Sequence, residues 1–360
     1  MNNKPRLLAY YLPQFHPIPE NDEWWGKGFT EWTNVGKAKS LFPGHEQPKL
    51  PGELGYYDLR VPETREAQAA LAREYGIEGF CYWHYWFGNG KQLLERPFNE
   101  VLESGKPDFP FCLAWANEPW KGFWHGLKDR QILIDQLYPG EQDYIDHFYS
   151  VLPAFKDPRY IRVDGKPIFM VYRPFDLPDA KEFMTLWKQL AIDNDLPGIY
   201  FVGMTIFDDS VDNIRSMGFD AVNLVGMERF RCHRKPVKYS IVSKLYKMIY
   251  GCKQVAFYED ASRYFVTDIE KRNDVYPTAI SNWDHTPRTG KKGLVLHGST
   301  PTLFMRHLNK LKEACQSKDN EHNIIFLKSW NEWGEGNYVE PDMVWGRQYL
   351  EAIRKVFFED

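Results

Sequence analysis

Two glutamates near the C-terminal end of the chain have residue types and a spacing that suit acid–base chemistry. Glu332 and Glu335 lie in the stretch 328–336 (KSWNEWGEG), which follows the apolar run 323–327. That run predicts a buried strand, because it is too short for a helix. One helical turn after the strand would place the two carboxyl groups on the same side, with Cβ atoms about 5–6 Å apart. A carboxyl pair, one acting as acid and the other as base or nucleophile, is the usual equipment of glycoside hydrolysis.

Tryptophan is concentrated where the predicted strands end. The chain holds 13 Trp and 21 Tyr, and aromatic residues make up 16% of it. Of the 13 tryptophans, 11 fall on or just beyond predicted strand ends, whereas Trp187 and Trp345 fall in predicted helices. Indole rings offer flat apolar walls of the kind against which a sugar ring packs. The alternative, that the tryptophans fill the core and the glutamates are solvated loop charges, leaves this placement unexplained.

Apolar runs and helical patterns alternate along the whole chain. Amphipathic stretches at 63–75, 179–193 and 302–315 predict helices, and Gly76 provides a C-terminal cap for the first of them. Eight strands alternating with helices predict an α/β fold, a (β/α)8 or TIM barrel with elaborated βα loops, as one domain spanning 1–360. A doubly wound open sheet is the alternative, but its G-x-G-x-x-G phosphate fingerprint is absent. The strands are expected at 6–13, 77–84, 109–116, 167–173, 198–205, 220–225, 276–283 and 323–330.

In such a barrel the residues just past each strand face one common mouth, where ligands bind. Trp124 and His125, beyond the third predicted strand, belong to this region of the sequence. If the ligand is an oligosaccharide or polysaccharide, polar side chains and indoles at the mouth should hold it. The residues expected to contact it are Gln14, His16, Trp83, His84, Trp86, Trp115, Asn117, Glu118, Trp120, Tyr172, Arg173, Trp283, Asp284, Trp330, Asn331 and Trp333.

The histidines and remaining carboxylates favour sugar contacts over a metal site. His16, His84 and His125 could join Asp284 around a metal, but no His-x-His or His-x-x-x-His spacing supports this. We therefore expect no metal and no cofactor, and we expect these side chains to bond sugar hydroxyls. Glu118 precedes a proline in a motif similar to the acid/base motif of many retaining barrel glycosidases. There the motif follows the fourth strand, whereas Glu118 follows the third, so it is either a substrate contact or a turn carboxylate.

Charge and hydropathy exclude several functional classes. The chain has 45 Lys and Arg against 49 Asp and Glu, so no global basic field predicts a nucleic-acid partner. Cys81 and Cys112 lie in apolar runs and are expected to be buried thiols. The first apolar run, 7–12, is too short for a signal peptide, and no 18-residue apolar stretch occurs. We therefore expect a cytoplasmic protein.

The segment 228–254 differs from the rest of the chain in charge. It holds eight Lys or Arg residues against the single acid Glu228. Five apolar residues recur within it at helical spacing, namely Ile241, Val242, Leu245, Met248 and Ile249. These features predict a basic amphipathic insertion. It either makes a weak contact with an anionic membrane surface or packs its apolar stripe on the barrel, and we favour the packing interpretation.

Four longer motifs give the chain a family resemblance. They are YLPQFHPIPEN at 11–21, GFTEWTNV at 28–35, NWD at 282–284 with TPR at 286–288, and WNEWGEG at 330–336. In this order they resemble the WbsX-type proteins of bacterial surface-polysaccharide clusters. Those proteins are related to glycoside hydrolase family 99, the endo-acting α-mannosidases and mannanases with a (β/α)8 barrel. The resemblance covers nearly the whole chain.

The resemblance implies a mechanism and assigns its residues. In family 99 the last motif carries both catalytic glutamates, which map onto Glu332 and Glu335. The first deprotonates the sugar 2-hydroxyl, which attacks C1 to give a 1,2-anhydro sugar, and the second protonates the leaving oxygen and later activates water. The implied substrate is an α-mannoside-like or other 2-hydroxy sugar of a bacterial surface polysaccharide.

Two other classes of function stay open at this point. A glycosyltransferase of lipopolysaccharide or O-antigen biosynthesis would need a nucleotide-sugar site, and Asp208-Asp209 is the nearest approach to its usual Asp-x-Asp motif. A non-catalytic glycan-binding protein would keep binding after loss of Glu332 and Glu335.

Overall fold

The long apolar runs of the sequence form parallel strands. The computed structural model describes residues 4–122, 131–232 and 237–359, with Trp124 and His125 outside these ranges. Parallel strands are buried on both faces, which explains why their sequences are continuously rather than alternately apolar. The eight principal strands are β1 (Arg6–Tyr11), β2 (Gly79–Trp86), β4 (Phe111–Trp115), β8 (Lys166–Val171), β9 (Tyr200–Thr205), β10 (Ala221–Leu224), β12 (Val275–Ile280) and β14 (Ile324–Lys328).

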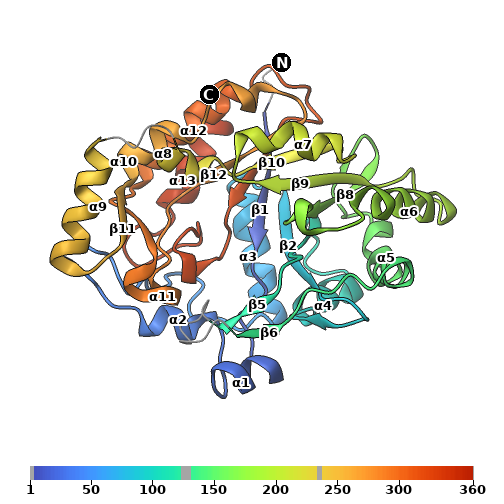
Figure 1. The fold of residues 1–360 in the computed structure, drawn as a ribbon, viewed down its shortest axis with the longest axis horizontal. Coiled ribbons are helices and arrows are strands. Elements are labelled where there is room, and N and C mark those ends of the chain that lie inside the picture. Colours follow the sequence, from blue (N-terminus) through green and yellow to red (C-terminus); the bar gives the residue numbers. More distant parts are fainter. Residues whose placement is uncertain (1–3, 123–130, 233–236, 360) are drawn as a thin grey trace.

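These eight strands close into a barrel (Figure 1). Around the barrel the order is β1-β14-β12-β10-β9-β8-β4-β2, and β2 pairs with β1 again. Leu8 of β1 lies opposite Phe326 of β14 on one side and Gly79 of β2 on the other, both in parallel register. The predicted (β/α)8 barrel is confirmed, and every predicted strand overlaps one of its eight.

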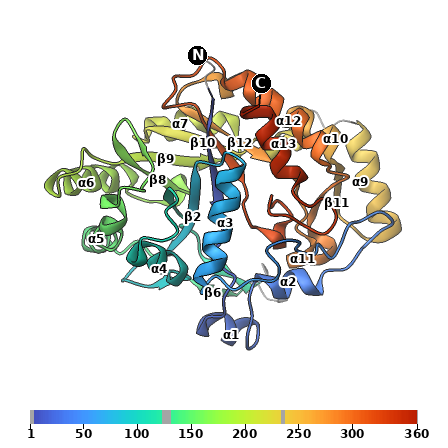
Figure 2. The same cartoon turned by 180° about the vertical axis from the view of Figure 1, so that it is seen from behind.

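Helices follow the strands and cover the outside of the barrel. Proline starts several of them, and in α12 the Thr300 side chain also accepts a bond from Leu303 N, a standard N-terminal cap. Helices α5 and α6 lie on one flank of the molecule in both views (Figures 1 and 2). The principal outer helices are α3 (Pro62–Glu74), α4 (Arg96–Ser104), α5 (Glu141–Lys156), α6 (Ala180–Asp193), α7 (Val211–Ser216), α12 (Pro301–Cys315) and α13 (Gln348–Phe357).

Long insertions elaborate the connections that leave the carboxyl ends of the strands. The connection from β1 holds α1 (Pro19–Trp25) and α2 (Glu31–Lys37). Two short pairs accompany the barrel: β11 (Gln254–Phe257) lies parallel to β13 (Leu294–His297), and β5 (Trp120–Lys121) lies antiparallel to β6 (Ile132–Ile134). The other strands and α-helices of the described residues are β3 (Gln92–Leu93), β7 (Arg162–Val163), α8 (Arg229–Cys232), α9 (Val237–Tyr250), α10 (Tyr258–Ala261) and α11 (Thr286–Thr289).

The core lies inside the barrel and between the barrel and its helices. Cys81 and Cys112 are buried free thiols, as the sequence predicts. Trp187 packs in α6, but Trp345 lies in a turn before α13 rather than in a helix. Among the described residues, no helix is both long and apolar enough to cross a membrane.

Candidate active site

Glu332 and Glu335 lie together in the turn that follows β14. The chain leaves the strand at Lys328 and forms a short 3-10 turn over Trp333–Glu335. Asn337 Nδ2 lies 3.4 Å from Glu332 Oε2 and 3.3 Å from Glu335 Oε2. The two carboxylate oxygens are therefore separated by no more than the sum of these distances. This places both acids within reach of one glycosidic bond.

The turn is fixed by buried hydrogen bonds to other strands and loops. Asn331 accepts a bond from Leu12 N at 2.7 Å and donates one to Leu12 O at 3.0 Å, so it joins the ends of β14 and β1. Trp333 donates its indole N–H to Glu340 at 2.6 Å and stacks on Tyr338 with ring centroids 3.6 Å apart. Side chains held by packing and hydrogen bonds lose little freedom when a ligand binds, so the turn that carries Glu332 and Glu335 is preorganised.

Glu332 is buried among hydrogen-bond donors. Only 4% of the residue is exposed, and Trp83 Nε1 donates to its Oε1 at 2.7 Å. Lys328 Nζ and Asn337 Nδ2 each lie 3.4 Å from the other oxygen. Burial raises the pKa of Glu332, partly opposed by the charge of Lys328 and reinforced by that of Glu335.

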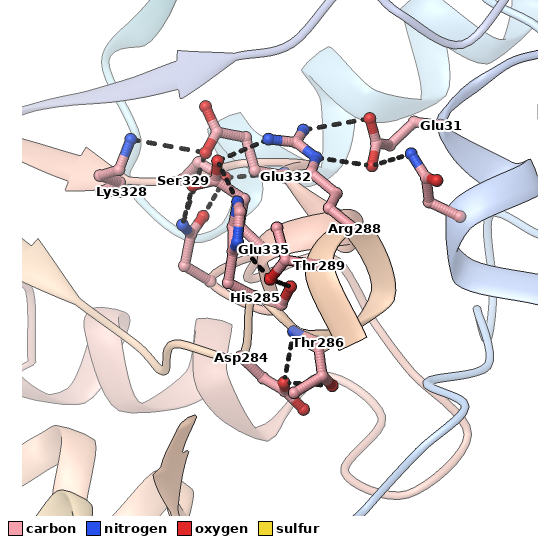
Figure 3. Close-up of polar contacts among 12 residues, drawn as sticks. Glu31, Asp284, His285, Thr286, Arg288, Thr289, Lys328, Ser329, Glu332 and Glu335 are labelled. Carbon is pink, nitrogen blue, oxygen red and sulfur yellow. Dashed lines mark hydrogen bonds and ion pairs between the residues drawn. The ribbon is translucent and has the colours of Figure 1, made fainter. Parts of the chain in front are cut away.

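Glu335 is held by an arginine that also binds a second glutamate (Figure 3). Arg288 donates to Glu335 Oε1 at 2.5 Å and to both oxygens of Glu31 at 3.0 Å. The Glu31 side chain is fully buried. Gly334 makes this arrangement possible, because a Cβ atom at that position would overlap the Glu31 carboxylate. Residues from α2, α11 and the β14 turn thus form one charge network.

Asp284 positions the short helix that carries Arg288. Its Oδ1 accepts bonds from the backbone and hydroxyl of Thr286, at the start of α11. Its Oδ2 accepts from Gln47 at 2.6 Å and lies 2.8 Å from His45 Nε2. Burial acts to raise the Asp284 pKa, but the hydrogen bonds and charge of His45 outweigh it, and the pKa is lowered. Asp284 therefore fixes the position of α11 and, through it, that of Arg288.

A cavity of about 500 Å³ opens beside the two glutamates. It lies at the carboxyl ends of the barrel strands, where barrel proteins bind their ligands. Glu118 lines it and pairs with Arg173 at 3.0 Å, while Trp83 stacks on Tyr10 and meets Tyr172 edge-on. Nine of the residues predicted from sequence border this cavity: Gln14, Trp83, Glu118, Trp120, Tyr172, Arg173, Trp283, Glu332 and Glu335.

The other nine predicted residues do not line this cavity. Alternation along the strands accounts for several of them, because successive side chains point to opposite faces. Trp83 and Tyr85 of β2 line the cavity, whereas His84 and Trp86 point outward and pack on His147 of α5. The full set outside the cavity is His16, His84, Trp86, Trp115, Asn117, Asp284, Trp330, Asn331 and Trp333.

These residues outside the cavity have structural roles. Trp115 donates to Trp86 O at 2.9 Å within the outer core. Asn117 bonds both the N–H and the C=O of Arg173, and so joins the ends of β4 and β8. His16 lies 3.0 Å from Pro13 O through Nδ1. Trp330 is fully buried against Phe80. The structure thus places these side chains behind the cavity wall, where they support the residues that line it.

The site residues predicted from sequence omit several charged or titratable residues that border the cavity, and three of these lie within 4 Å of Glu332 or Glu335. Lys328, His285 and Arg288 all line it, and Glu31 lies directly behind Arg288. All four occur in or beside the four family-like motifs, which was the available signal. Burial, with the charge of Arg288, lowers the pKa of His285 to about 4, so this ring is neutral near pH 7. Within the described ranges, no group of three or more His, Cys, Asp or Glu side chains is arranged to hold a metal ion.

Fold and site together define a (β/α)8 barrel protein with a carboxylate-bearing cavity at the carboxyl ends of its strands. A family model described as "Glycosyltransferase WbsX" matches residues 7–353. The chain belongs to this WbsX family.

Relatives in Xanthomonas campestris pv. campestris agree with this membership. Two proteins described as "Uncharacterized protein WxcX", from strains B100 and ATCC 33913, are each 36% identical to this chain. The matches cover 97% of this chain and 49% of each relative. The chain thus spans about half the length of the curated relatives it matches.

Solved structures share the barrel fold. A "Glycoside hydrolase-like protein" superposes with a TM-score of 0.65 at 16% identity, over 99% of this chain and 94% of that chain. The GH99 endo-alpha-mannosidase from Bacteroides thetaiotaomicron superposes with a TM-score of 0.57 at 15% identity, over 98% and 96%.

Proposed function

We propose that the protein is a retaining glycoside hydrolase that cleaves α-mannoside-like linkages of a bacterial surface polysaccharide. The observation that carries this proposal is the pair Glu332 and Glu335, joined through Asn337 at the edge of the cavity. The fold that it shares with an endo-alpha-mannosidase supports the proposal. The chain spans about half the length of its curated relatives, so the proposed activity is that of this barrel and not of the whole relatives.

We assign Glu332 as the base. Burial alone favours an acid, since it raises the Glu332 pKa and favours the protonated form. However, the groups around its carboxylate are donors, namely Trp83 Nε1, Lys328 Nζ and Asn337 Nδ2, and none of them can accept a carboxyl proton. A carboxylate surrounded in this way suits proton uptake from a sugar hydroxyl, and its raised pKa increases its basicity.

We assign Glu335 as the acid. Its side chain is more exposed than that of Glu332, 15% against 5%, so it is open to the leaving-group oxygen. In the first step Glu332 removes the 2-hydroxyl proton, the 2-oxygen attacks C1, and Glu335 protonates the departing oxygen. In the second step Glu335 removes a proton from water, which opens the 1,2-anhydro ring at C1, and Glu332 returns its proton to the 2-oxygen. Two displacements at C1 give net retention.

The indole and phenol rings around the cavity supply the sugar-binding walls. Trp83, Trp120, Tyr172 and Trp283 all border it. Flat aromatic surfaces with a polar edge bind a ligand that combines apolar ring faces with hydroxyl groups.

The description of the family as glycosyltransferases favours a second candidate, transfer of a sugar from a nucleotide donor. Incubation with the host's purified surface polysaccharide, and separately with nucleotide sugars, distinguishes the two. We expect release of oligosaccharide from the polysaccharide by the wild type and none by the variant Glu332→Gln/Glu335→Gln. Release of UDP or GDP dependent on an acceptor, with no cleavage of polysaccharide, would reject the hydrolase.

A further inference from the structure

Helix α9 lies at the outer edge of the molecule, opposite α5 and α6, in both views (Figures 1 and 2). Its inner face is anchored by aromatic contacts. Tyr246 and Tyr250 pack on Phe42, with ring centroids 4.8 Å and 6.1 Å away. Phe42 belongs to a small separate core with Val255 and Val295. The helix is thus held to the barrel by one face only.

The opposite face of α9 exposes a stripe of large apolar side chains. Ile241, Leu245, Met248 and Ile249 are exposed by 52%, 44%, 76% and 60%. Their spacing places them along one side of a helix, turned away from Tyr246 and Tyr250. The interpretation that we favoured from the sequence, packing of this stripe on the barrel, is therefore wrong for these four residues. A contiguous exposed apolar stripe marks an interaction surface.

Lysines border the stripe. Lys244 and Lys247 are exposed on the same helix, next to the apolar residues. Exposed Lys253, Lys291 and Lys292 extend the basic surface, because Lys253 N donates to Lys291 O where the two segments adjoin. The sequence from 237 to 254 contains no Asp or Glu, although the whole chain has a net charge of −4. We call this stripe and its five lysines the α9 surface.

We propose that the α9 surface docks onto an anionic lipid bilayer. A helix with a cationic border and large apolar side chains lies in the headgroup plane, inserts its apolar face about 5–10 Å and attracts anionic lipids. A second copy of this chain is a poor occupant, since a two-fold contact would bring the same lysines against each other. The proposal is independent of the roles of Glu332 and Glu335.

Vesicle co-sedimentation tests the proposal. Wild-type protein should sediment with vesicles of phosphatidylcholine and phosphatidylglycerol at 50 mM NaCl. It should stay in the supernatant with vesicles of pure phosphatidylcholine, and with the anionic vesicles at 500 mM NaCl. The partition coefficient of Lys244→Glu/Lys247→Glu onto anionic vesicles should fall by at least about 25-fold, since each lysine near such a surface contributes about fivefold. Leu245→Ser/Met248→Ser should lose binding through the apolar contact instead.

Matched surface variants control for general changes in charge and hydropathy. Met343→Ser/Val344→Ser removes apolar side chains exposed by 70% and 60% elsewhere, and Lys181→Glu reverses an exposed charge on α6. Both controls should bind like the wild type, and circular dichroism should show all variants folded. If the apolar variant fails to fold, the lysine variant decides. Absent binding to anionic vesicles at low salt, or equal binding by wild type and both α9 variants, would overturn the proposal. A wild-type dimer that is lost in Leu245→Ser/Met248→Ser, without vesicle binding, would also overturn it.

Discussion

Replacing Arg288 with methionine should destabilise the fold as well as the site. The variant leaves Glu31, whose side chain is fully buried, without the guanidinium that bonds both of its oxygens. Removing one partner of a buried ion pair costs about 3–5 kcal/mol, because the remaining charge stays desolvated. An unfolding entropy of about 2.1 cal/mol/K per residue converts this loss, for 360 residues, into a fall in Tm of about 4–7 °C.

Two further variants separate the buried charge from a general loss of arginine. Arg347→Met removes a partly exposed arginine that pairs with Glu53 and Glu74, and should lower Tm by about 1 °C or less. The double variant Arg288→Met/Glu31→Gln has no unpaired charge at position 31. Its Tm should therefore lie between that of Arg288→Met and that of the wild type.

Differential scanning calorimetry of the four proteins at one pH and salt concentration gives the comparison. Initial rates on the cleaved glycan, measured in parallel, should be low for both Arg288 variants, since Arg288 also fixes Glu335. A fall in Tm for Arg288→Met no larger than that for Arg347→Met would contradict a stabilising role of the buried Arg288–Glu31 pair. A lower Tm for the double variant than for Arg288→Met alone would contradict it as well.

Glu332 and Glu335, to which we assign the roles of base and acid, should respond differently to substitution. Glu335→Gln should slow natural glycosides far more than activated aryl glycosides, because a good leaving group needs no proton, while Glu332→Gln should slow both about equally. Steady-state rates on the two substrate types decide this, and equal losses for both variants would contradict the assignment. Trp83→Phe keeps an aromatic ring but removes the 2.7 Å bond to Glu332, so kcat should fall by about 10- to 150-fold with a smaller change in KM; an unchanged kcat would remove Trp83 from the mechanism. Burial raises the pKa of Glu340 to about 7, although hydrogen bonds from Trp333 and other donors act to lower it. Between pH 4.5 and 7 the folded protein therefore keeps a proton on Glu340 that the unfolded chain has lost. Relative to Glu340→Gln, the wild type should therefore be most stable below pH 4.5 and lose about 3 kcal/mol as the pH rises to 7, as measured by urea unfolding; a difference independent of pH would contradict this.

The barrel strands could be predicted because each is buried on both faces and therefore reads as an uninterrupted apolar run. The same property hid the direction of individual side chains. In β2 the run GFCYWHYW shows no polar alternation, so Trp83 and Trp86 look equivalent in sequence, yet only Trp83 borders the cavity. Counting alternate positions back from a known inward residue would have separated them.

The charge network of the site depends on contacts that sequence spacing does not reveal. Glu31 and Arg288 are 257 positions apart and meet because α2 and α11 both pack beside the turn after β14. The pair Glu332 and Glu335 was predictable because both residues lie in one turn, where local geometry alone brings them together. The outward direction of the α9 stripe was not predictable, because either face of an amphipathic pattern can be buried until the aromatic anchors, here Tyr246 and Tyr250, are seen.

The anomeric configuration of the first product tests the proposed chemistry most directly. Proton NMR recorded during cleavage of the host polysaccharide, before mutarotation, distinguishes retention from inversion at the released reducing end. We predict that the α anomer forms first with wild-type enzyme, and that Glu332→Gln forms no product at a measurable rate. Initial release of the β anomer, or undiminished cleavage by Glu332→Gln, would contradict a mechanism in which the 2-hydroxyl attacks C1 with Glu332 as its base.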